Sequence, residues 1–178
     1  MNDRYLLENP SRVTVGTIGP VGERLFVLQA RDATQLVTIK VEKVQVASLA
    51  TYLGRMLRQL ARPHDLPEGD ELALETFENP DFTAEALALT YDELEDRIVL
   101  VIDEIDTSEA EEEEEGAGVG VEGAMARVAM TREQAAALAI RATELVEAGR
   151  PPCPLCGYPL DPRGHACPRT NGNTAPLT

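Results

Sequence analysis

The chain carries the same succession of secondary-structure patterns twice, which constrains its fold more than any other feature. Alternating apolar and polar residues predict three strands in each half, and a helical period of apolar residues follows them. In the first half these elements lie at 12–18, 25–30, 36–41 and 44–60. In the second half they lie at 82–90, 97–105, 124–130 and 132–148. We therefore expect an α+β fold, in which antiparallel-rich sheet is backed by two helices.

The two halves also match residue by residue. Without gaps, residues 17–28 align with 90–101, and residues 37–49 align with 126–138, which pairs Gln45 with Gln134. We interpret this as a duplicated βββα unit. The predicted divisions are a first repeat at 1–62, a second repeat at 63–150 and a tail at 151–178.

The second half is longer because it contains an acidic low-complexity stretch at about 107–123. Five consecutive glutamates stand there, followed by three spaced glycines. Such a run repels itself and buries little apolar surface, so we expect a disordered loop. The formal net charge is −15, and it disfavours non-specific binding to nucleic acid or to anionic membranes.

The beginning of the chain turns polar too early to resemble a signal peptide. No apolar run approaches the length that crosses a bilayer. We therefore expect a cytoplasmic protein without membrane contact, in which cysteines stay reduced and available to metal.

The tail contains a cluster of metal-binding residue types. All three cysteines and one of the two histidines fall within 15 residues, as Cys153, Cys156, His165 and Cys167. Thiolate and imidazole are preferred zinc ligands, and a Cys-x-x-Cys turn brings two sulfurs to one ion. Gly157 permits the positive φ that such a turn often needs. We predict one Zn²⁺ per chain, held by these four residues.

Other chemistry for this cluster stays open. The form is similar to a small zinc ribbon, but Thr170 stands where the second knuckle would carry a fourth cysteine. Cys153 and Cys156 also have the spacing of a redox pair. Without His165 the site would have three ligands and an open position, as catalytic zinc sites do. We favour structural zinc over a reactive thiol cluster, and both over catalytic zinc.

Remaining polar clusters have simpler explanations than a ligand site. Four carboxylates between predicted strands, Asp92, Glu93, Glu95 and Asp96, are expected to form a solvated turn. Residues 22–24 are expected to form a polar hairpin turn, and residues 42–43 and 131–133 are expected to cap helices. His64 lies in a proline-flanked loop and is expected at the surface.

Three stretches carry a resemblance to a known family. They are GPVGERLFVLQA at 19–30, EKVQVA at 42–47, and GRPPCPLCGYPLDPRGHACPRTNG at 149–172. Together they resemble an uncharacterised actinobacterial family of short proteins with a domain of unknown function. The resemblance implies that Cys153, Cys156, His165 and Cys167 belong to that family's own motif, and it implies no activity.

Function follows mainly from the metal cluster and from missing catalytic motifs. No phosphate-binding glycine loop, Gly-x-Ser-x-Gly or His-Glu-x-x-His motif is present. We expect a non-enzymatic interaction or adaptor protein whose tail contacts a partner, protein rather than nucleic acid. The expected contact residues are Arg163, Arg169, Thr170 and Asn171. The alternatives are a small enzyme, with its site between the repeats or at an open zinc, and nucleic-acid binding through the tail.

Overall fold

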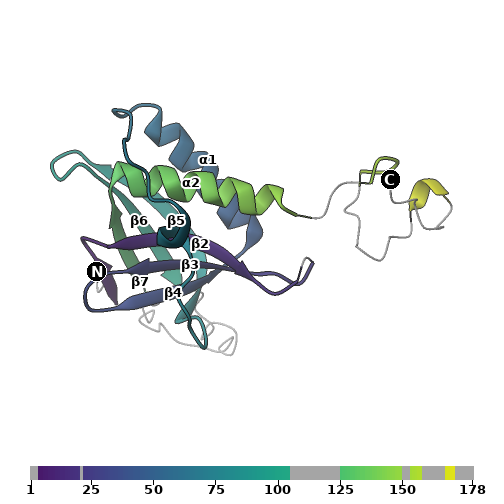
Figure 1. Ribbon diagram of the computed structural model, residues 1–178, viewed down its shortest axis with the longest axis horizontal. Helices are drawn as coiled ribbons and strands as arrows, with labels where there is room; N and C mark the ends of the chain where they lie inside the picture. The colour runs from purple at the N-terminus through teal and green to yellow at the C-terminus, as the bar shows by residue number, and fades with distance from the viewer. Residues whose placement is uncertain (1–3, 21, 105–124, 150–152, 158–166, 171–178) are drawn as a thin grey trace, which may run out of the picture.

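A computed structural model describes residues 4–20, 22–104, 125–149, 153–157 and 167–170 (Figure 1). Its strands are β1 (Tyr5–Leu7), β2 (Arg12–Ile18), β3 (Leu25–Arg31), β4 (Leu36–Val41), β5 (Phe82–Asp92), β6 (Arg97–Glu104) and β7 (Met125–Met130). Its helices are α1 (Lys43–Leu57) and α2 (Arg132–Glu147), with short 3₁₀ helices at Gly69–Leu72 and Pro168–Thr170. The predicted acidic loop, about 107–123, lies outside the described residues.

The α+β prediction is confirmed, and the strands form one sheet in the order β1-β7-β6-β5-β4-β3-β2. β2, β3 and β4 form an antiparallel meander, and so do β5, β6 and β7. The two meanders join where β4 and β5 pair in parallel, through Ile39 with Phe82 and Lys40 with Thr83. The order of elements is thus βββα twice, as expected, and whether a duplication produced it stays a prediction.

β1 is a strand that the sequence patterns did not predict. It has three residues, too few for alternation to be visible. It pairs in parallel with β7, the last strand in chain order. The sheet curls, so that β1 at its edge lies near β4 and β5 at its middle. The rings of Tyr5 and Phe82 stack with centroids 5.8 Å apart, and Gln35 Nε2 donates to Leu6 O.

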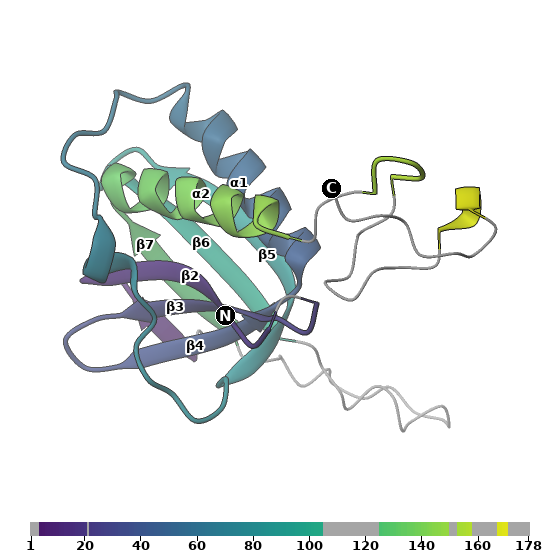
Figure 2. The ribbon, with the colours of Figure 1, turned by 45° about the vertical axis from the view of Figure 1, so that its right-hand side comes forward.

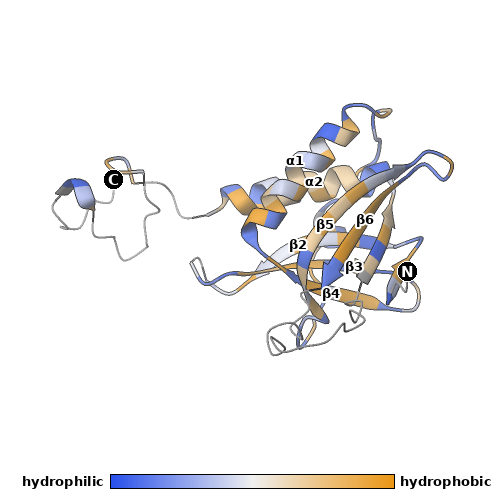
Figure 3. Cartoon of the chain, turned by 180° about the vertical axis from the view of Figure 1, so that it is seen from behind, coloured by the Kyte–Doolittle hydropathy of each residue, from blue (hydrophilic) through white to orange (hydrophobic). Residues whose placement is uncertain are grey.

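Both helices lie on one face of the sheet (Figures 1 and 2), and that face is apolar. A single buried cluster includes core-face residues of both meanders and of both helices. β6 lies in the interior of the sheet. It pairs on both edges, its Ile98, Leu100 and Ile102 are fully buried, and its ribbon is largely hydrophobic in Figure 3.

Each helix packs on the first long strand of the other half. α2 lies on β2, and α1 lies beside β5, so neither half encloses a core of its own. The helices are antiparallel neighbours, since Arg132 Nη1 at the beginning of α2 donates to Ala61 O beyond the end of α1. At the opposite end, Lys43 Nζ lies close to Gly149.

Two glutamines hold each helix against the opposite half of the sheet, and they do so by equivalent contacts. Gln45 Oε1 accepts from the N–H of Glu42, the N-cap of α1, and its Nε2 donates to Ala84 O at the beginning of β5. Gln134 Oε1 accepts from the N–H of Thr131, the N-cap of α2, and its Nε2 donates to Pro10 O just before β2. The sequence alignment that paired these glutamines therefore agrees with their structural roles.

The other ungapped alignment, of 17–28 with 90–101, is out of register by one residue. Six residues join β2 to β3, whereas four join β5 to β6. The alignment therefore pairs Leu28, which lies in the core, with Val101, which lies on the other face of the sheet. A shift of one residue reverses the face on which a strand side chain lies, so the longer loop explains the mismatch.

The outer face of β2, β3 and β4 is covered by residues 69–81, which we call the crossing segment. The buried polar residues Thr14 and Gln29 bind its backbone. Thr14 Oγ1 donates to Leu72 O, and the Gln29 amide both donates to Glu75 O and accepts from Glu75 N. Gly16 is needed beneath this segment, because a Cβ there would lie 2.5 Å from Leu74 Cδ1.

We predict that Gln134→Ala lowers the free energy of unfolding by about 1–2 kcal/mol, because it removes a helix cap and leaves Pro10 O without its donor. Urea denaturation would measure the change. Gln59→Ala, at an exposed position, is the matched control and should change stability by less than about 0.5 kcal/mol. Equal effects of the two substitutions would contradict the proposed role of Gln134.

Candidate metal centre

The Cys-x-x-Cys segment forms a tight turn. Residues 154–156 make the turn, and Gly157 N donates to Cys153 O at 2.8 Å. Gly157 has φ of +76°, as predicted, a conformation that costs glycine little because it lacks a Cβ. The backbone thereby directs both cysteines of the motif toward the same point.

Cys167, ten residues after Gly157, lies beside this turn. The three Sγ atoms all lie within 4.8 Å of one another, and those of Cys153 and Cys167 are 4.0 Å apart. Two sulfur ligands of one tetrahedral zinc, each at about 2.3 Å from it, are separated by roughly 3.8 Å. The cysteine triad can therefore hold a metal ion without a large rearrangement.

The separation of the sulfurs also bears on the redox alternative. The Sγ atoms of Cys153 and Cys167 are 4.0 Å apart, well beyond the distance of about 2.05 Å that a disulfide requires. Cys153 and Cys167 are buried, and Cys156 is partly buried. His165, the predicted fourth ligand, lies outside the described residues, and so do Arg163 and Asn171. Arg169 is exposed and lies within the 3₁₀ helix Pro168–Thr170, which follows Cys167.

The carboxylates of the turn at 92–96 do not converge as metal ligands. Among the described residues, only the three cysteines do so. Asp96 instead forms a structural ion pair with Arg132 and accepts from Tyr91 Oη at 2.7 Å. These hydrogen bonds, Arg132 first and Tyr91 second, lower the pKa of the Asp96 carboxyl. Because Arg132 also reaches Ala61 O, this pair joins the β5–β6 turn to both helices.

A second ion pair holds the crossing segment, and the sequence patterns did not reveal it. Arg31 Nε donates to Glu75 Oε1 at 2.9 Å, and Arg12 lies 3.6 Å from the same oxygen. The hydrogen bond from Arg31 lowers the pKa of Glu75.

His64 is exposed, as predicted.

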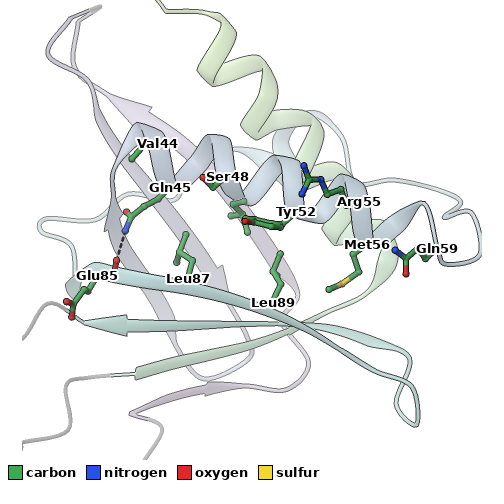
Figure 4. Close-up of a pocket in the computed structure, with 11 residues that line it drawn as sticks. Val44, Gln45, Ser48, Tyr52, Arg55, Met56, Gln59, Glu85, Leu87 and Leu89 are labelled. Carbon is green, nitrogen blue, oxygen red and sulfur yellow. Dashed lines mark hydrogen bonds between the residues drawn. The ribbon is translucent and has the colours of Figure 1, made fainter.

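A groove lies between the two halves, where the enzyme alternative placed a site (Figure 4). We call it the α1/β5 groove. Its volume is about 600 Å³, and Val44, Gln45, Ser48, Leu49, Tyr52, Arg55, Met56, Gln59, Glu85, Leu87 and Leu89 line it. Apolar side chains dominate, and no histidine or cysteine is among them. The lining therefore suits a ligand with apolar groups.

The ion pair of Asp96 predicts a pH-dependent contribution to stability. Its pKa is lower in the folded chain than in the unfolded chain, so the contribution is present above the ordinary aspartate pKa and is lost as pH falls through the folded value. The stability difference between wild type and Asp96→Asn should therefore be largest near neutrality and shrink in acid. Chemical denaturation at several pH values would measure it. Glu95→Gln, exposed in the same turn and outside this ion pair, is the control.

Among the described residues, no helix is long and apolar enough to cross a bilayer. No curated protein and no solved structure matches the chain. A model of one protein family matches residues 5–167, from β1 to the last cysteine, and its description is "protein of unknown function (DUF3090)". The chain therefore belongs to the DUF3090 family.

Proposed function

We propose that this protein is a non-enzymatic interaction module whose C-terminal tail is folded around one structural Zn²⁺. Cys153, Cys156 and Cys167 would supply three ligands, and His165 would supply the fourth. The convergence of the three sulfurs within 4.8 Å carries this proposal. The reducing cytoplasm expected from the sequence would keep the thiols available for the metal.

The packing of the tail supports a structural role for the metal. In its described part, the buried cluster consists of Cys153 and Cys167, with Cys156 packed against them. These are thiols rather than hydrocarbon side chains, and a segment of fewer than 40 residues rarely folds on an apolar core alone. Zinc bound by such a segment contributes its binding free energy directly to folding.

A partner protein would bind the surface that the zinc organises. Arg169 is exposed beside the buried Cys167, and Arg163, Thr170 and Asn171 are close to it in sequence. Arginine is common at the centres of protein interfaces, because its guanidinium donates several hydrogen bonds and stacks on flat groups. The net charge of −15 makes an acidic nucleic acid a less suitable partner than a protein.

We predict one zinc per chain by native mass spectrometry of the full protein. Cys156→Ser, Cys167→Ser and His165→Ala should each weaken zinc retention, because each removes a ligand. His64→Ala changes the other histidine of the chain and is the matched control, with zinc retention equal to wild type. A chelator should destabilise the tail while circular dichroism of the sheet and helices stays unchanged.

The variants separate the proposal from its competitors. Normal zinc retention in His165→Ala would indicate an open coordination position and favour the enzyme alternative. A protein without zinc, whose Cys153 and Cys156 oxidise reversibly, would favour thiol chemistry. Either result would overturn a closed Cys₃His site.

The interaction role has its own test. Pull-down with the full chain and with residues 151–178 deleted should give partners that depend on the tail. Arg169→Glu, which changes charge but no metal ligand, should lose the same partners while retaining zinc. Unchanged partners after deletion would contradict the proposal, and binding that falls steeply with salt would indicate nucleic acid.

A further inference from the structure

We propose that the α1/β5 groove binds an extended peptide segment, which adds as a strand to the open edge of β5. This site is separate from the cysteine tail. Three features of the molecule favour such binding: an unpaired strand edge, a space between that edge and a helix, and opposite charges at the two ends of the space.

The open edge follows from the pairing of β5. β5 pairs with β6 from Ala84 to Asp92, with a bulge at Glu85, but on the other edge only Phe82 and Thr83 pair with β4. The side-chain amide of Gln45 then binds Ala84 O and Glu85 O, in place of a neighbouring strand. Beyond Glu85, no other strand in the described part of the chain pairs with this edge. In an antiparallel pair, alternate residues direct their N–H and C=O groups away from the partner, and these groups can pair with an added strand.

The corresponding edge of β2, in contrast, is closed by α2. Arg141 of α2 donates its Nε proton to Val15 O at 2.7 Å, and Val15 is fully buried. Several alanines in α2, including Ala135 and Ala142, are buried and allow the helix to approach closely. α2 therefore leaves no room for another strand beside β2.

At the equivalent place, α1 leaves the edge open. Tyr52 follows Gln45 by seven residues, as Arg141 follows Gln134, so the two occupy corresponding positions of their helices. The Tyr52 side chain is 58% exposed and lines the groove with Met56. α1 has Tyr52 where α2 has Arg141, and it has Ser48 where α2 has the buried Ala137. These differences accompany the wider space between helix and strand. A helix beside an exposed strand edge is a recurring arrangement for binding extended peptides.

Charges at the ends of the groove specify the peptide further. α1 and β5 run in the same direction along the groove, with Glu85 at one end and Arg55 toward the other (Figure 4). Leu87 and Leu89 lie between these ends and point toward α1. The expected ligand has apolar side chains at alternate positions facing these leucines, a basic residue near Glu85 and an acidic residue near Arg55.

The probes are fluorescent seven-residue peptides with blocked ends. Three alternate positions are apolar, one terminal residue is lysine and the other is glutamate, and both orders are made, one for each strand direction. Fluorescence anisotropy with the full-length protein should show saturable binding of one order. N-methylation of the backbone amides that face β5 should weaken it by more than tenfold, because strand addition uses these donors.

Charge reversal identifies the groove. Arg55→Glu should weaken binding at least fivefold, and replacement of the peptide glutamate by lysine should restore it. Arg58→Glu, also exposed but outside the groove lining, is the matched control and should bind as wild type does. Thermal unfolding of both variants would establish that they are folded.

Several outcomes would overturn the inference. Absence of saturable binding by either peptide order would do so, as would equal binding of the N-methylated peptide or unchanged binding in Arg55→Glu. Decanoate that binds this groove while no peptide does would indicate a small apolar carboxylate instead. Binding that persists in Cys167→Ser would support the groove as a site independent of the tail, and binding lost with the metal would assign it to the tail.

Discussion

The structure depends on the reciprocal packing of each helix against the other half of the sheet. An apolar sheet face has to be covered, and neither βββα unit covers its own first long strand. Gln45 and Gln134 determine where the exchange occurs, because each caps its own helix and binds the backbone at the beginning of the opposite strand. The two halves consequently fold into one core, although their order of elements repeats.

Equivalent positions in the two halves have different environments, and this difference leaves an open groove in one of them. On one side, Arg141 and the alanines of α2 close the edge of β2, and the crossing segment covers the outer face of the same meander. On the other side, Tyr52 and Met56 line an open groove beside β5. Two halves with the same order of elements thus differ at equivalent strand edges, one closed by its helix and the other bordering a groove.

The described part of the tail buries a different kind of side chain from the sheet. The sheet and helices bury Ile, Leu and Val side chains, each contributing about 1.5–3 kcal/mol when fully buried. In the described part of the tail, the buried residues are thiols, and their sulfurs converge. Coordination of a metal is the interaction through which such a short segment can order. The protein therefore combines an apolar core with a cysteine cluster that can hold a metal ion.

Local physics explains what the sequence by itself determined. Alternation predicted six strands, the helical period predicted both helices, Thr131 was recognised as an N-cap, and Gly157 was expected at positive φ. These features depend on near neighbours and backbone preferences. Only the tertiary structure decided the three-residue strand β1, the burial of Gln29 beneath the crossing segment and the open edge of β5. Each of these results from pairing between residues far apart in the chain, whose partners no local pattern identifies.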